Sequence, residues 1–197
     1  MKKILLTTIP FLIVVIMLFT KCSGTVNADS KPEAFMNGGY ETQVKWGEHL
    51  VAISGCTDCH TPKKMTDHGP VPDDALFLSG RPAANPSIDV NRKEMQQKGL
   101  VVTQDLTEWV GPWGVSYAAN LTPDETGTGN WKEEQFIRAL KEGKYKGLEG
   151  GRTLLPPMPW EQFKNFSDDE VKAIFAFIKT IKPISNLVPA VLPPEAK

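Results

Sequence analysis

Hydrophobic residues recur at helical spacing in three stretches of this chain. The apolar positions are Val44, Leu50 and Val51 in residues 42–54, Phe136, Ile137 and Leu140 in residues 131–142, and Val171, Ile174, Phe175, Ile178 and Ile181 in the last stretch. Gly55 stands where the first helix would stop, and Pro183 stops the third. Asn130 is placed to cap the second helix, and Ser167 with Glu170 forms a capping box for the third. The pattern predicts three principal helices.

Residues 61–119 are rich in proline and glycine, and they predict a long loop with at most one short helix, near residues 89–97. No segment alternates hydrophobic and polar residues long enough to predict a sheet. Trp109, Trp113 and Tyr117 could line a pocket or form a hydrophobic plug under the loop, and we favour the plug. From residue 183 onward the chain is proline-rich and is predicted to extend over the surface.

The N-terminus carries two lysines, an apolar run over residues 4–19, and then Lys21 and Cys22. The run is shorter than the roughly 20 residues that span a bilayer, so it predicts a signal peptide over residues 1–21. A cysteine directly after an export signal resembles the lipobox of bacterial lipoproteins, which predicts lipidation of Cys22. An uncleaved signal anchor and cleavage near residues 26–28 are the alternatives.

Composition and charge exclude some classes of protein function and fold. The 22 Lys and Arg nearly balance the 23 Asp and Glu, and without residues 1–21 the balance is 19 against 23, so no nucleic-acid partner is predicted. Three cysteines exclude a disulfide-dense scaffold. Residues 22–39 are small, polar and without periodicity, which predicts a flexible tether before a domain over residues 40–197.

Cys56, Cys59 and His60 form Cys-Thr-Asp-Cys-His, the attachment pattern of c-type haem. Two thiols one helical turn apart can add to the two vinyl groups of a porphyrin edge, and the next imidazole can bind the iron. The motif therefore predicts one covalent haem c with its iron bound by His60. The alternatives fit less well: a thioredoxin-like pair needs a preceding strand, a zinc site needs a fourth ligand, and a disulfide leaves His60 unexplained.

The sixth ligand of the iron separates an electron carrier from an enzyme. The candidates are Met36, Met65, Met95, Met158, His49 and His68. We favour Met158, because it lies in Leu-Pro-Pro-Met-Pro-Trp, where prolines on both sides fix the backbone and hold the thioether in a preset position. A buried structural methionine is the alternative. Met65 and His68 are so close to His60 in sequence that the opposite haem face is hard to reach.

The motifs together resemble class I cytochromes c, and more narrowly the haem domains in cytochrome subunits of membrane-bound bacterial alcohol, aldehyde and gluconate dehydrogenases. The shared stretches are Cys56–His60, Asn120–Asp124, Thr126–Trp131, Leu155–Trp160 and the last helix. The resemblance implies an all-α, class I cytochrome c fold with three main helices around one covalent haem and a long loop insertion. It also implies that Met158 is the distal ligand and that Gly47 closely approaches Phe175 or Phe177. Those subunits carry several haem motifs per chain, whereas this chain has one.

Asn120, Trp131 and Arg152 are candidate donors to the haem propionates, since two carboxylates beside an apolar pocket need hydrogen-bond donors. For Trp131, packing into the core is an equal alternative. No catalytic residue is assigned, because His60 and Met158 together would leave the iron no open position.

The sequence predicts an exported, membrane-tethered single-haem cytochrome c that passes single electrons between redox proteins, a membrane dehydrogenase or a terminal oxidase. Its expected location is the outer side of the cytoplasmic membrane or the periplasm, and it is expected not to be an enzyme. One rival is a haem enzyme or gas sensor with an open distal site, for which His68 would be the polar group. Another is a docking subunit of a membrane dehydrogenase.

Overall fold

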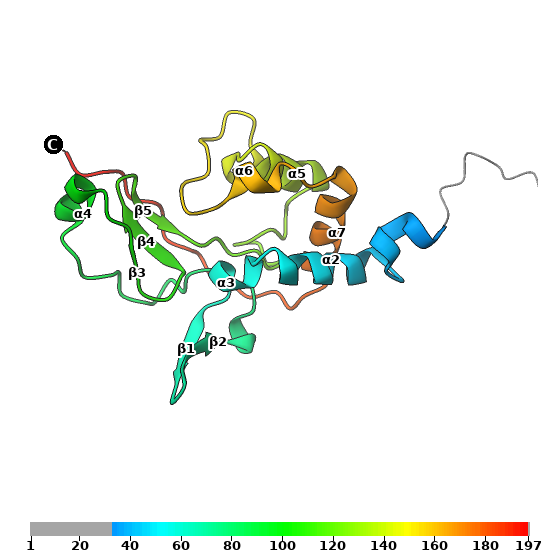
Figure 1. Ribbon diagram of the computed structural model, residues 1–197, viewed down its shortest axis with the longest axis horizontal. Helices are drawn as coiled ribbons and strands as arrows, with labels where there is room; N and C mark the ends of the chain where they lie inside the picture. Colours follow the sequence, from blue (N-terminus) through cyan, green and yellow to red (C-terminus); the bar gives the residue numbers. More distant parts are fainter. Residues whose placement is uncertain (1–32, 197) are drawn as a thin grey trace, which may run out of the picture. The chain divides into compact units, whose positions relative to one another are not determined.

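The computed structural model describes residues 33–196, of which residues 36–196 belong to one compact unit (Figure 1). The predicted signal peptide, Cys22 and most of the predicted tether lie outside the described residues. The last residues of the tether form a 3-10 helix, η1 (Glu33–Gly39), whose backbone is non-helical at Met36, Asn37 and Gly38. Within residues 33–196, no helix has both the length and the apolar character needed to cross a bilayer.

Helices α2 (Gln43–Ile53) and α7 (Asp168–Ile178) pack against each other and supply most of the hydrophobic core (Figure 1). Their close approach occurs at Gly47. A methyl group at this position would collide with the backbone carbonyl of Ala173 and would stand 2.9 Å from Cβ of Phe177. The predicted approach of Gly47 to Phe177 is therefore confirmed.

The ends of these two helices follow the sequence signals. The hydroxyl of Thr42 accepts a hydrogen bond from the Lys45 N–H at 3.1 Å and caps α2. In α7 the predicted capping box is present: the Glu170 N–H donates to the Ser167 hydroxyl at 3.2 Å, and the Ser167 N–H donates to the Glu170 carboxylate at 2.7 Å. These bonds satisfy backbone groups that the first turn of a helix leaves unpaired.

Helix α5 (Glu133–Lys141) begins later than predicted. Its cap is Lys132, whose N–H donates to the Gln135 side chain at 3.0 Å, and not Asn130. The reason is the preceding turn, in which the carbonyl of Asp124 accepts hydrogen bonds from two glycine N–H groups and the Thr128 carbonyl accepts one from Trp131. The short helices α6 (Trp160–Phe163) and η3 (Tyr145–Gly147) both contact α5.

One core joins these helices and the loop that follows the haem motif. It contains Leu50, Val51, Leu78, Phe136, Leu140, Val171, Ala173, Ile174, Phe175 and Ile178. The rings of Phe136 and Phe175 stack with centroids 5.0 Å apart, which links α5 to α7.

The expectation of an all-α fold is not confirmed, because residues 61–119 contain five short strands (Figure 1). Strands β1 (Lys63–Thr66) and β2 (Gly69–Pro72) form an antiparallel hairpin. Strands β3 (Val102–Thr103), β4 (Glu108–Gly111) and β5 (Gly114–Tyr117) form an antiparallel sheet in that order. Along the chain, η2 (Asp74–Leu76) and α4 (Arg92–Lys98) come after β2 and before β3. Helix α4 overlaps the short helix predicted at residues 89–97. The prediction of a loop with at most one short helix is therefore wrong.

The sequence did not predict these strands because none of them shows a recognisable alternation of hydrophobic and polar residues. All four residues of β4 are buried, so both faces of the strand are covered and no hydrophobic alternation appears in its sequence. The other strands have at most four residues, which is too short for a period of two to stand out. Buried Glu108 in β4 pairs with buried Arg81 at 2.8 Å, so even its charged residue belongs to the interior.

The C-terminal segment runs as an extended chain, as predicted, and is held by hydrogen bonds to the rest of the domain. Val115 and Leu192 exchange two backbone hydrogen bonds of 2.9 and 3.1 Å, which adds the segment to the edge strand β5. The Asn186 side-chain amide donates to the carbonyls of Ser79 and Arg81 at 2.7 and 2.9 Å.

Candidate haem site

The Cys-Thr-Asp-Cys-His motif forms the short helix α3 (Cys56–His60), directly after α2. Gly55 precedes it with φ of +68°, a left-handed conformation that a glycine adopts without strain. The thiols of Cys56 and Cys59 are free and half-buried, and Cys56 packs against the hydrophobic core. Burial raises the pKa of the Cys56 thiol to about 11 and raises that of Cys59 as well. Two neutral thiols are thus presented one helical turn apart.

His60 is buried, and its ring is oriented by a backbone carbonyl. Nδ1 lies 2.8 Å from the carbonyl oxygen of Ala119. A carbonyl can only accept, so Nδ1 carries the proton and Nε2 keeps a free lone pair. Burial lowers the pKa of His60, which favours the neutral imidazole. A neutral imidazole with a hydrogen-bonded second nitrogen is the form in which histidine binds metals.

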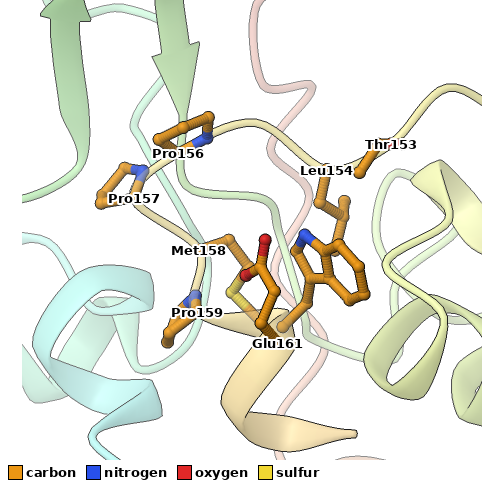
Figure 2. A pocket seen from close by; sticks show the side chains of 8 residues that line it. Thr153, Leu154, Pro156, Pro157, Met158, Pro159 and Glu161 are labelled. Atoms are coloured by element: carbon orange, nitrogen blue, oxygen red, sulfur yellow. The ribbon is translucent and has the colours of Figure 1, made fainter.

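Met158 lies in the loop between η3 and α6, and Figure 2 shows it between Pro157 and Pro159. The loop borders a cavity of about 220 Å³ lined by Thr153, Leu154, Pro156, Pro157, Met158, Pro159, Trp160 and Glu161. Met158 is half-buried and packs against the same core as Cys56. Its N–H donates to the Leu155 carbonyl at 3.3 Å, and its own carbonyl accepts from the Trp160 N–H at 3.0 Å.

Four of the other five candidate ligands lie on the surface. The side chains of Met36 and Met65 are 57% and 79% exposed. His68 is exposed in the two-residue turn between β1 and β2, and His49 is exposed and stacks on Tyr40 with ring centroids 5.1 Å apart. Met95 is half-buried on α4. Among residues 33–196, no group of three His, Cys, Asp or Glu side chains is arranged to hold a metal ion without further help.

The three candidate propionate donors have different surroundings. Both amide hydrogens of Asn120 are engaged, one by the Thr126 hydroxyl at 3.1 Å and one by the Ile184 carbonyl at 2.8 Å. Trp131 packs against the hydrophobic core. Arg152 is exposed, with its guanidinium 4.0 Å from the centre of the Tyr145 ring. Their role at the propionates stays a prediction, and Asn120 could serve only by giving up one of these bonds.

Trp109 in β4 and Trp113 in the turn between β4 and β5 have different surroundings. Trp109 is buried in β4, as a plug would be. The Trp113 indole instead donates to the Ser116 hydroxyl at 3.0 Å, and that hydroxyl donates to the Pro156 carbonyl at 2.6 Å. The sheet therefore reaches, through Ser116, the loop that carries Met158 (residues 148–159, the methionine loop). No sequence signal identified Ser116, because a serine in a short strand carries no motif.

A family comparison bears directly on this arrangement. Residues 44–182 match the cytochrome c family model. This range contains nearly all of α2, and all of α3, the five strands, the methionine loop and α7. The chain belongs to the cytochrome c family. The haem c of this cytochrome is covalently bound and holds iron, and its chemistry is electron transfer. The residues fit such a group: two free thiols lie one turn apart, and the adjacent histidine has its Nε2 lone pair free.

The curated relatives of this cytochrome are subunits of dehydrogenases. It is 31% identical to the alcohol dehydrogenase (quinone) cytochrome c subunit of Gluconobacter oxydans over 74% of this chain and 23% of that subunit. It is 29% identical to the gluconate 2-dehydrogenase cytochrome c subunit of Pantoea cypripedii, over 73% of this chain and 24% of that one. The fructose dehydrogenase cytochrome subunit of Gluconobacter japonicus is 27% identical over 74% and 23%. The chain thus spans about a quarter of the length of these relatives.

Proposed function

We propose that the chain is a single-haem electron carrier in which Cys56 and Cys59 attach the haem and His60 and Met158 bind its iron. The haem would supply one-electron chemistry between ferric and ferrous iron. The observation that carries the proposal is the 2.8 Å contact between His60 Nδ1 and the Ala119 carbonyl. It holds the imidazole in the one tautomer that leaves Nε2 available to the metal.

The surroundings of Met158 support its role as the second axial ligand. It is half-buried against the core that Cys56 also contacts, whereas Met36 and Met65 point into solvent. Its prolines restrict the backbone, so little conformational entropy is lost when the thioether binds iron. A soft thioether ligand together with an imidazole ligand would favour ferrous iron and raise the reduction potential.

The same features argue for a carrier and against an enzyme with an open distal site. The residues that line the cavity beside Met158 are largely apolar, and Glu161 supplies the one carboxylate among them. His68, the polar group that the enzyme alternative requires, is exposed on the β1–β2 hairpin.

For the partner and location, we propose an exported chain held at the membrane through Cys22, with a membrane dehydrogenase or a terminal oxidase as its redox partner. The names of the relatives support a dehydrogenase. The lysines and apolar run before Cys22 support export. Labelled palmitate should enter the wild type and not Cys22→Ser, and equal labelling of both would contradict the anchor.

The axial ligands can be tested on protein matured in a bacterial periplasm. Denaturing mass spectrometry should find one haem attached, and Ala at both Cys56 and Cys59 should abolish the attachment. The ferric wild type should show the weak red charge-transfer band of thioether-bound iron. Met158→Ala should remove this band and admit carbon monoxide to the ferrous iron, and the control Met65→Ala should do neither. A band that depends on Met65, or rapid carbon monoxide binding by the wild type, would refute the proposal.

A further inference from the structure

Ser116 connects the inserted sheet to the loop that carries Met158. It is 6% exposed, so its hydroxyl lies in a place where an unpaired polar group is costly. The hydroxyl donates to the Pro156 carbonyl at 2.6 Å and accepts from the Trp113 indole N–H at 3.0 Å. Its one proton therefore goes to the methionine loop, and the indole fixes the direction of that bond.

Residues 156–159 of the methionine loop donate few main-chain hydrogen bonds. Pro156, Pro157 and Pro159 lack a backbone N–H, so three of the four residues from 156 to 159 cannot donate a main-chain hydrogen bond. The N–H of Met158 makes a long bond of 3.3 Å to Leu155. A hydrogen bond from outside the loop, two residues before the thioether, therefore has a large share in setting the position of Met158.

The segment that supplies this bond is itself firmly held. Ser116 pairs with Trp109 across the β4–β5 ladder, and its neighbour Val115 bonds to the C-terminal segment on the other side. Three residues after Ser116, the carbonyl of Ala119 accepts the hydrogen bond from His60 Nδ1. One short stretch of chain, residues 116–119, thus hydrogen-bonds both to His60 and to the methionine loop at Pro156.

We propose that Ser116 is a positioning residue for Met158, and that residues 116–119 set the two axial ligands relative to each other. This inference rests on the proposed axial role of Met158. Ser116 would act through its hydrogen bond to the Pro156 carbonyl, which would stabilise the closed loop, the loop conformation that holds the Met158 thioether for the iron. The Trp113 indole supports Ser116 in this role.

The inference predicts how easily an added ligand displaces Met158. Imidazole binds ferric iron only after the thioether has left, so its apparent affinity reports the fraction of open loop. Ser116→Ala removes one hydrogen bond from the closed loop and should raise that affinity about fivefold, the change expected for a hydrogen bond with an ordinary net contribution. Ser116→Thr retains the hydroxyl and should restore most of the wild-type value. Trp113→Phe keeps a ring but loses the N–H, so it should shift the affinity in the same direction by a smaller factor.

The controls separate positioning from general destabilisation. Ser79 is also buried, at 1% exposed, and its hydroxyl donates a 2.8 Å hydrogen bond to the Leu76 carbonyl instead of to the methionine loop. Ser79→Ala should therefore leave the imidazole affinity unchanged. In a Met158→Ala background no thioether has to leave, so adding Ser116→Ala should change the affinity by less than about twofold.

Two results would overturn the inference alone. One is a Ser116→Ala holoprotein, with its red band intact, whose imidazole affinity lies within about twofold of the wild type. The other is an equal effect of Ser116→Ala with and without Met158. If Met158→Ala itself leaves the red band and the imidazole affinity unchanged, the proposed ligand is wrong and the inference falls with it. Trp113→Phe gives the same test if Ser116→Ala does not yield holoprotein.

Discussion

The crossing of α2 and α7 allows a sharp test through Gly47→Ala. In a solvent-exposed helix this change would stabilise the protein, because alanine has a helix propensity about 1 kcal/mol more favourable than glycine. At Gly47 the added methyl would meet the Ala173 carbonyl and would stand 2.9 Å from Cβ of Phe177. We therefore expect the opposite sign.

The size of the effect follows from what must move. The Ala173 carbonyl belongs to the backbone of α7, so no flexible side chain can rotate away, and the helices themselves must separate. Overpacking of this kind costs about 1–3 kcal/mol, and a backbone collision belongs near the upper end. After the gain of about 1 kcal/mol from propensity, a net loss of about 2 kcal/mol in the free energy of unfolding remains.

Urea unfolding of the holoprotein, followed by helical circular dichroism, measures this loss. The matched control is Ala52→Gly, the reverse substitution at an exposed position of the same helix, which should lose about 1 kcal/mol or less through propensity alone. Both variants should thus be less stable than the wild type, although the substitutions are reciprocal. A Gly47→Ala protein as stable as the wild type, or more stable, would refute the packing argument.

Three further outcomes are expected. Ser167→Ala should lower the free energy of unfolding by about 1 kcal/mol through loss of the α7 cap, and an unchanged urea midpoint would contradict this. Arg81→Met should cost about 3–5 kcal/mol, because it leaves the buried Glu108 carboxylate without its charged partner; a loss below about 1 kcal/mol would show that the pair matters little. Lys141 donates a hydrogen bond to Asp168 and lowers the pKa of that carboxyl. The bond therefore stabilises the fold fully above the ordinary aspartate pKa, and this stabilisation is lost as the pH falls through the lowered pKa. Lys141→Met should therefore be less stable than the wild type near neutral pH and equal to it in acid, as urea titrations at several pH values would reveal.

The methionine loop marks the limit of what sequence reasoning could reach at the candidate site. The haem motif is local: five consecutive residues carry the thiols and the imidazole, so their spacing alone predicts the chemistry. The prediction that Met158 is an iron ligand also rests on a local signal, its proline neighbours. The hydroxyl of Ser116, 40 residues before Pro156 in sequence, carries no such signal.

Local patterns in this sequence determined the three principal helices, the α7 capping box and the position of the attachment motif, because each depends on residues within about one or two turns of each other. They did not determine the inserted strands, since β4 is buried on both faces and takes its form from partners brought in by the fold. The same holds for Asn120, a candidate propionate donor by sequence, whose amide is engaged by the Ile184 carbonyl of the C-terminal segment. The tautomer of His60 depends on the carbonyl of Ala119, 59 residues away, and contacts of that span exist only after the chain has folded.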